Sequence, residues 1–165
     1  MENLTGLKLR KITFIILVCC LAAIFFSSFN LIIAKAHDVK RRADIKILTK
    51  ALDLYHDKYG VYPESDDDQR GWDLTYDPKA GEARFLTILK EEGFMDKMAA
   101  DPMNNATFLY RYQKYPSGSF GCNQSFYILQ ILNFELPTDN TGRGICPEIN
   151  WGEDAPNGYT IQAFD

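Results

Sequence analysis

The stretch RRADIKILTKALDLYHDKYGVYP, residues 41–63, decides the fold that this sequence predicts. Its apolar residues recur in steps of three or four, which is the period of an α-helix with one buried side. Gly60 suits a C-terminal cap, and Pro63 prevents the helix from continuing. We therefore predict an amphipathic helix that ends at Tyr59. Its apolar stripe consists of Ile45, Leu48, Leu52, Tyr55 and Tyr59, widened by Ile47, Ala51 and Leu54.

An uncharged apolar run precedes this stretch. Residues 12–34, ITFIILVCCLAAIFFSSFNLIIA, are 23 residues without a charge, and about 20 apolar residues span the hydrocarbon core of a bilayer as a helix. No Pro or Gly lies between Ile12 and Tyr59, which predicts one helix of ~48 residues, about 70 Å long. The expected parts are a basic tail (1–11), a transmembrane helix (12–34), its amphipathic continuation (35–59) and a globular domain (60–165).

Burial as a core helix and removal as a secretion signal are the alternative interpretations of the apolar run, and a fully buried helix of this length does not suit so small a protein. The tripeptide Ala34-Lys35-Ala36 resembles a signal-peptidase cleavage site. However, the apolar region of a signal peptide is usually about 7–15 residues long. The length of this run therefore favours a retained membrane anchor.

Charge is distributed unevenly along the chain. Residues 1–42 hold seven basic and two acidic residues, a net +5, whereas residues 43–165 hold 11 basic and 20 acidic residues, a net −9. An acidic domain repels phosphate backbones, which argues against nucleic acid as a partner. Alternating aromatic residues in 108–115 could stack bases, but a core face packed on the long helix explains them as well. Basic residues flank the apolar run on both sides, so the positive-inside rule leaves its orientation open.

The cysteines supply a clue to the compartment. Cys122 and Cys146 are the only cysteines outside the apolar run, and both lie in Gly- or Pro-containing turn sequences. Such a pair suggests a disulfide and hence an oxidising environment outside the cytoplasm; two unrelated thiols are the alternative. Cys19 and Cys20 lie within the apolar run and are expected to stay reduced.

The remainder of the chain predicts one short helix and a small sheet. Residues 64–81 are polar and rich in turn-forming residues, which indicates a surface loop. The helix is expected over EARFLTILKEE (82–92), and the strands over FLYRYQKY (108–115), SFYILQILNF (125–134) and YTIQAF (159–164). We therefore predict an α+β fold in which the long N-terminal helix packs on a three-stranded antiparallel sheet, with a short second helix.

The sequence offers no set of catalytic side chains. Its only histidines, His37 and His56, are 19 residues apart, which is about 28 Å along a helix. They cannot share a site with one nucleophile. We expect a protein that is not an enzyme.

The order of these elements resembles the type IV pilin and type II secretion pseudopilin superfamily, especially the major pseudopilins. In that family the long helix ends in a motif like Asp-Asn-Gly-x-Tyr-Pro, which KYGVYP (58–63) matches here. A segment like Gly-Tyr-Leu-x-x-x-Pro-x-Asp-Pro follows in the family, and GFMDKMAADP (93–102) is similar to it. The resemblance covers roughly residues 35–165.

The resemblance implies a pilin-like fold and a structural role. It implies a subunit of a pseudopilus or type IV pilus-like assembly, serving protein secretion, adhesion or a surface filament. The chain would cross the bacterial inner membrane once, with its domain in the periplasm or at the cell surface. Its partners would be the membrane, copies of itself and other pilin-like subunits. The alternative is a monomeric, membrane-tethered binding domain that does not polymerise.

The N-terminus departs from the family pattern. The family carries a prepilin peptidase signature, Gly followed by Phe-Thr-Leu-x-Glu, which would place the cut here between Gly6 and Leu7. Lys11 stands where the family has the glutamate, and no acid occurs from Leu7 to His37. This departure favours the tethered alternative, because in the family that glutamate is thought to pair with a neighbour's N-terminal amine.

Calcium is the one cofactor that the sequence suggests. The carboxylates of DDD (66–68) could bind a hard cation. The major pseudopilins bind calcium in a loop near their C-terminus, and the resemblance points to Glu153, Asp154 and Asn157 within WGEDAPNG (151–158). Solvated loop acids without a metal are the alternative for both stretches.

Overall fold

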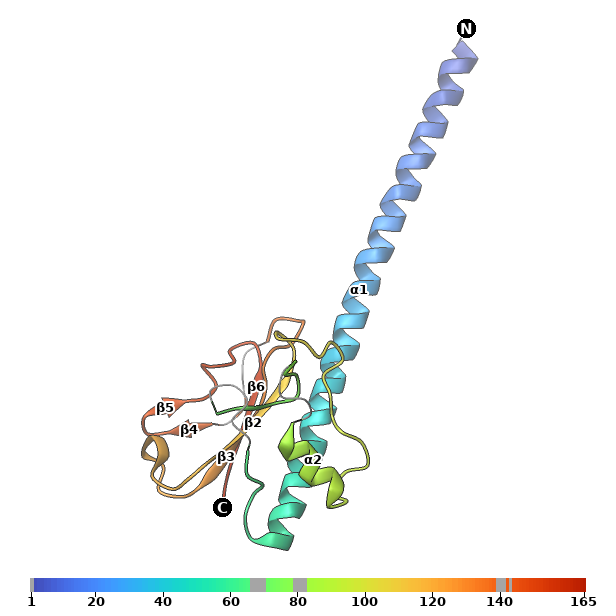
Figure 1. The fold of residues 1–165 in the computed structure, drawn as a ribbon. Coiled ribbons are helices and arrows are strands. Elements are labelled where there is room, and N and C mark those ends of the chain that lie inside the picture. The colour runs from blue at the N-terminus through green and yellow to red at the C-terminus, as the bar shows by residue number, and fades with distance from the viewer. Residues whose placement is uncertain (1, 66–70, 79–82, 139–141, 143) are drawn as a thin grey trace. The chain divides into compact units, whose positions relative to one another are not determined.

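The computed structural model describes residues 2–65, 71–78, 83–138, 142 and 144–165, and for residues 2–5, 7 and 27 only the backbone. The chain forms an α+β fold in which a long N-terminal helix packs against an antiparallel sheet (Figure 1). It divides into two compact units, Met1–Ala36 and His37–Asp165.

The long helix, α1, covers Glu2–Tyr59. It begins ten residues earlier than the expected start at Ile12, so the basic tail is helical from residue 2 onward. The predicted end at Tyr59 is confirmed. Gly60 has a φ of +73°, and its N–H donates to the carbonyl of His56 at 2.7 Å. Glycine adopts this left-handed conformation without the steric cost of a Cβ, which explains why the helix ends there.

The sheet has four strands in the order β1-β2-β3-β6, and all neighbours are antiparallel. Three of them, β2 (Tyr110–Tyr115), β3 (Phe126–Ile131) and β6 (Tyr159–Phe164), form the predicted meander. The expected three-stranded sheet was nevertheless wrong by one strand. β1 (Asp73–Leu74) pairs with β2 inside the stretch that was predicted to be a surface loop.

Asp73 explains why so short a strand is held at the sheet edge. Its carboxylate accepts hydrogen bonds from the backbone N–H groups of Arg84 and Phe85, at 3.0 and 2.8 Å. These residues open the short helix α2 (Arg84–Glu91), whose first N–H groups have no partner within the helix. A buried side chain of β1 therefore caps α2 and joins the sheet edge to the helix.

The remaining elements are small. They are the 3₁₀ turn η1 (Ser119–Gly121) and the two-stranded hairpin of β4 (Ile145–Cys146) and β5 (Ile149–Asn150).

The main core lies between α1, α2 and one face of the sheet. Leu48 and Leu52 of α1 are fully buried, and the rings of Phe85 and Tyr112 stack at 4.7 Å. The prediction that Ile47 and Leu54 widen the buried stripe was wrong, because their residues are 53% and 41% exposed. At 3.6 residues per turn both positions lie about 100° or more around the helix from Leu48.

A second core covers the opposite face of the sheet. It includes Trp72, Leu109, Phe126 and Trp151 together with the two cysteines outside α1. All six residues of β3 are buried, which confirms the prediction of a central strand covered on both faces.

Candidate functional site

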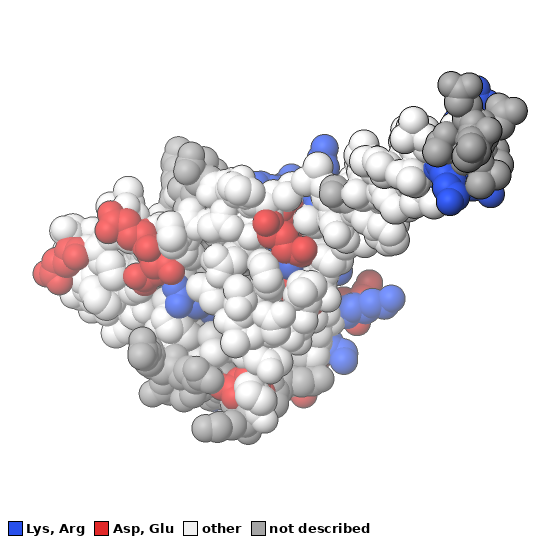
Figure 2. All heavy atoms as spheres, turned by 90° about the horizontal axis from the view of Figure 1, so that it is seen from above, with Lys and Arg blue, Asp and Glu red and all other residues white. Residues whose placement is uncertain are grey.

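The first unit exposes its apolar side chains. Among its described residues every large apolar side chain is exposed, with Ile24 at 63% and Phe25 at 68%. Figure 2 shows this stretch as an uncharged surface with basic residues at its N-terminal end. Within the described part of the chain, α1 is the one helix long and apolar enough to span a membrane. The unit therefore presents a surface suited to lipid or to other apolar helices.

The expected processing site lies within the same helix. Gly6 and Leu7 are both inside α1, and Lys11 is exposed one turn further on. Cleavage between Gly6 and Leu7 stays a prediction.

In the second unit, α1 has an outer face that carries apolar residues. Val39, Ala43, Ile47 and Leu54 are all exposed. At 3.6 residues per turn they fall within an arc of about 80°. We call these four residues the outer face of α1. Exposed apolar side chains grouped in this way are typical of a contact surface.

A basic groove borders the outer face. Arg42, Lys46 and Lys50 lie one helical turn apart along α1, and the groove also contacts Tyr159 and Ile161 of β6. Its volume is about 440 Å³. Three basic residues and one acidic residue, Asp53, line the groove, so it carries a net positive charge and would attract an acidic surface.

Arg41 connects α1 to several other parts of the domain. It is fully buried, and its Nε and Nη2 donate to the two carboxylate oxygens of Asp101 at 2.6 and 2.9 Å. Its Nη1 donates to Asp38 at 2.7 Å and to Glu135 at 3.0 Å. The guanidinium also lies 4.7 Å from the centre of the Phe108 ring. We call Arg41, Asp38, Asp101 and Glu135 the Arg41 clamp.

The clamp holds two loops against α1. Asp101 accepts a further hydrogen bond from the N–H of Met103, at 2.8 Å. Asp38 accepts the N–H groups of Glu135 and Leu136 at 2.9 and 3.0 Å. Burial lowers the pKa of Arg41, but the hydrogen bonds that Arg41 donates to Asp101 and Asp38 outweigh it, so the pKa of Arg41 rises above its ordinary value. Arg41 therefore stays charged, and the clamp is a structural joint between helix and loops.

Neighbouring polar groups extend this joint. Lys40 donates to Asp44 at 2.5 Å and to the carbonyl of Ala100 at 2.9 Å, and the hydroxyl of Tyr110 donates to Asp44 at 2.8 Å. His37 lies 2.6 Å from Glu135. These contacts connect residues 37–44 of α1 to the segments around Ala100, Tyr110 and Glu135.

The sequence did not reveal the clamp. Arg41 contacts Asp101 and Glu135 across 60 and 94 residues. The one available signal was a basic residue on the side of the helix that the apolar stripe marks as buried, since Arg41 lies one turn before Ile45 and two turns before Leu48.

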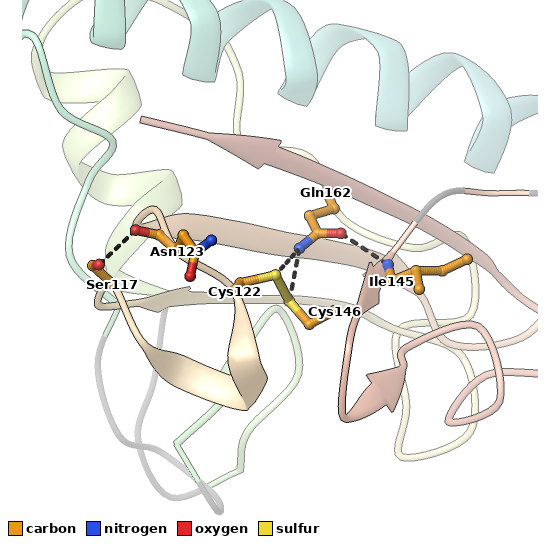
Figure 3. The surroundings of a disulfide bond; sticks show 6 residues. All are labelled: Ser117, Cys122, Asn123, Ile145, Cys146 and Gln162. Carbon is orange, nitrogen blue, oxygen red and sulfur yellow. Dashed lines mark hydrogen bonds between the residues drawn. A yellow bond between two sulfur atoms is a disulfide. The ribbon is translucent and has the colours of Figure 1, made fainter.

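The predicted disulfide is present. Cys122 and Cys146 are bonded, with their Cα atoms 5.3 Å apart, and the bond ties the segment after η1 to β4 (Figure 3). Gln162 of β6 lies beside it: its Nε2 is 3.3 Å from the sulfur of Cys146, and its Oε1 accepts the N–H of Ile145 at 2.8 Å. The disulfide therefore anchors the β4–β5 hairpin near the sheet.

The candidate calcium ligands do not converge. Asn157 donates to the carbonyl of Phe134 at 2.7 Å and accepts the N–H of Thr138 at 2.8 Å, so its side chain holds two loops together. Glu153 accepts from Asn150 at 3.2 Å, and Asp154 faces Arg111 at 3.9 Å. In the parts of the chain that the structure describes, no three His, Cys, Asp or Glu residues are arranged to hold a metal. Residues 66–68 lie outside the described residues.

Comparison with known proteins adds no relative. No family model, no curated protein and no solved structure matches the chain.

Proposed function

We propose that the chain is a non-enzymatic structural subunit of a pseudopilus or type IV pilus-like assembly. In this proposal residues 12–34 anchor it in the bacterial inner membrane, with residues 1–11 in the cytoplasm and the domain outside. Apolar helices of neighbouring subunits pack side by side, and the domains are displayed on the surface. The order of elements supports a pilin-like fold, namely a long apolar-then-amphipathic helix, a short helix and an antiparallel sheet.

The observation that carries the proposal is the apolar surface of α1. In the first unit the large apolar side chains of the described residues are exposed, and in the second unit Val39, Ile47 and Leu54 remain exposed although a full core lies on the other side of the helix. Lipid alone would explain the first surface. The outer face of α1 belongs to the folded domain, and a neighbouring subunit explains it better.

Two further features fit this role. A disulfide suits a domain on the oxidising side of the membrane. The Arg41 clamp joins helix residues 38–41 to two loops of the domain, which suits a subunit that is held by its helix and must not separate from it under load.

Photocrosslinking at the outer face tests the proposal. A photoreactive amino acid at Ile47, in the full chain in its own membranes, should give bands at multiples of the subunit mass after irradiation. The matched control places the same amino acid at Lys97, which is exposed on the segment after α2, and should give a much weaker ladder. Monomer alone at both positions would contradict assembly through α1.

A second candidate function is a membrane-tethered binding domain that does not polymerise. The exposed Lys11, in a helix without acidic residues from 7 to 36, favours it. The intact mass and N-terminal sequence of the protein from its own cells discriminate the two. A start at Leu7 supports processing and assembly, whereas a start at Met1 supports a permanent tether.

A further inference from the structure

A pocket lies on the face of the sheet opposite α1, in the second core. Its volume is about 580 Å³. Trp72, Leu109 and Leu132 form apolar walls, and its charged groups are Arg111 and Asp154. Arg111 reaches this face because it alternates along β2 with Tyr110 and Tyr112, which are buried in the main core. The pocket is thus separate from the Arg41 clamp and from the outer face of α1.

Arg111 is partly buried and incompletely paired. Its side chain is 15% exposed, and its Nε donates to Oε1 of Gln130 at 2.6 Å. Its Nη2 is buried and has no hydrogen-bond partner among the described residues. The nearest carboxylate oxygen, on Asp154, is 3.9 Å away, which is beyond hydrogen-bond distance. Arg41 differs in this respect, because all three of its guanidinium nitrogens donate to carboxylates.

Aromatic side chains surround Arg111. The guanidinium stacks 4.1 Å from the centre of the Trp72 ring. Trp151 meets Trp72 edge to face at 5.9 Å, and the Nε1 of Trp151 is a second buried donor without a hydrogen-bond partner. Burial lowers the pKa of Arg111, and the charge of Asp154 opposes this only in part. Native proteins rarely leave buried donors unpaired, so an unpaired donor calls for an explanation, and a bound partner that accepts its hydrogen bond is one.

We propose that this pocket binds a small ligand in which a carboxylate is attached to an apolar body. The ligand carboxylate accepts a hydrogen bond from Nη2 of Arg111. It takes the place of the Asp154 carboxylate, which lies 3.9 Å from this nitrogen. The Asp154 side chain is 46% exposed and makes no hydrogen bond to Arg111. A ligand oxygen can therefore displace it without breaking a hydrogen bond to Arg111. The apolar body lies against Trp72, Leu109 and Leu132.

This chemistry has two possible sources. The carboxylate belongs either to a free organic acid or to the C-terminal end of a peptide with an apolar last residue. Both present the same anion next to the same kind of apolar group. The inference concerns the domain itself and holds whether or not the chain assembles into filaments.

Calorimetry on the full chain in detergent micelles tests the proposal. The probes are 3-phenylpropionate and its neutral analogue 3-phenylpropan-1-ol, which differ in the charged group. We expect the acid to bind at least about tenfold more tightly, because a hydrogen bond between charged groups is stronger than one to a hydroxyl. Equal binding of the two, or no binding of the acid up to about 10 mM, would overturn the proposal.

Three variants locate the site. Arg111→Met should reduce acid binding at least about tenfold and leave alcohol binding unchanged. Arg42→Met removes an exposed arginine of α1 instead and should change neither. Asp154→Ala removes the competing carboxylate at the rim without touching the core, so acid binding should tighten about twofold or more. If Arg111→Met does not fold, Asp154→Ala decides, and weaker acid binding in that variant would overturn the proposal.

A comparison of peptides tests whether the bound carboxylate belongs to a peptide end or to a free organic acid. A short peptide ending in phenylalanine with a free carboxylate is compared with the same peptide carrying a C-terminal amide. Tighter binding of the free peptide than of 3-phenylpropionate supports a peptide end as the ligand, and weaker binding supports a free acid. Equal binding of the free and amidated peptides, together with equal binding of the acid and the alcohol, would overturn the carboxylate site.

Discussion

The two units of this chain differ in the solvent exposure of their large apolar side chains. Leu48 in the second unit is fully buried, whereas Ile24 in the first unit is 63% exposed, yet both lie on α1. In the second unit one side of the helix is apolar and the sheet and α2 cover it. In the first unit residues 12–34 of the helix are uncharged, and their described large apolar side chains are exposed. The difference indicates that contacts within the described chain hold the second unit together and leave the apolar side chains of the first unit uncovered.

We expect the largest loss of stability in the second unit when Arg41, the centre of the Arg41 clamp, is replaced. Arg41→Met leaves the carboxylates of Asp101, Asp38 and Glu135 near one another without their common cation. Removing one partner of a buried ion pair costs about 3–5 kcal/mol of unfolding free energy. Urea unfolding of the full chain in micelles, followed by near-ultraviolet circular dichroism, measures this loss.

The control for the clamp is the exposed Lys46. Lys46→Met should change the unfolding free energy by less than about 0.5 kcal/mol. Both variants should stay in the membrane fraction, because the first unit is intact. A loss below about 1 kcal/mol for Arg41→Met would mean that the clamp does not hold the loops.

The next largest effect compares the same kind of substitution in the two units. Leu48→Ala empties a fully buried position and should lower the unfolding free energy of the domain by about 2–5 kcal/mol. Ile24→Ala removes a similar side chain from the first unit and should change the same quantity by less than about 0.5 kcal/mol. Similar losses from both substitutions would show that the domain and the apolar run fold as one body.

Much of this arrangement could be read from local sequence. The helical period of residues 45–59, Gly60 and Pro63 predicted the end of α1, and alternating or continuous apolar runs predicted β2, β3 and β6. These signals depend on neighbours a few residues apart. The disulfide followed from two cysteines in turn sequences.

The missed features depend on contacts between distant residues. β1 has two residues, too few for any period, and it is held by the hydrogen bonds that Asp73 makes to α2. The Arg41 clamp and the Arg111 pocket each join segments separated by tens of residues. Ile47 and Leu54 were assigned to the core because an apolar residue on an amphipathic helix usually faces inward, and their exposure became visible only with the sheet in place.

The disulfide should contribute less to the unfolding free energy of the domain than the Arg41 clamp or the buried core position Leu48. Its cysteines are 24 residues apart, and bridges of this kind typically stabilise a domain by about 2–4 kcal/mol. The double variant Cys122→Ser, Cys146→Ser should lose that amount, whereas Cys19→Ser, Cys20→Ser in the first unit should leave domain stability unchanged. Alkylation before and after reduction checks the pairing: equal reactivity of Cys122 and Cys146 in both conditions would contradict it.

The smallest effect at neutral pH concerns the buried tyrosines. Burial, with the charge of Asp53 adding to it, raises the pKa of Tyr62 to about 12, and burial raises the pKa of Tyr110, Tyr112 and Tyr127 well above the ordinary value. Tyrosines in the unfolded chain titrate near pH 10, so above that pH the unfolded chain loses protons that the folded domain retains. Stability should therefore be unaffected below about pH 9 and should fall as the pH rises past about 10.

Absorbance at the tyrosinate band, recorded with circular dichroism, checks this pH dependence. Ionisation of the four buried tyrosines should coincide with loss of the folded signal. Ionisation near pH 10 with the fold intact would show that these hydroxyls are open to solvent.

The central claim is that the first unit finds its partners in a membrane among other subunits. Blue-native electrophoresis of the full chain, extracted mildly from its own membranes and compared with and without crosslinker, tests this most directly. The account predicts a ladder at multiples of the subunit mass of 18.9 kDa. A single monomer band under both conditions, from protein that is still membrane-bound, would contradict assembly and leave the tethered binding domain.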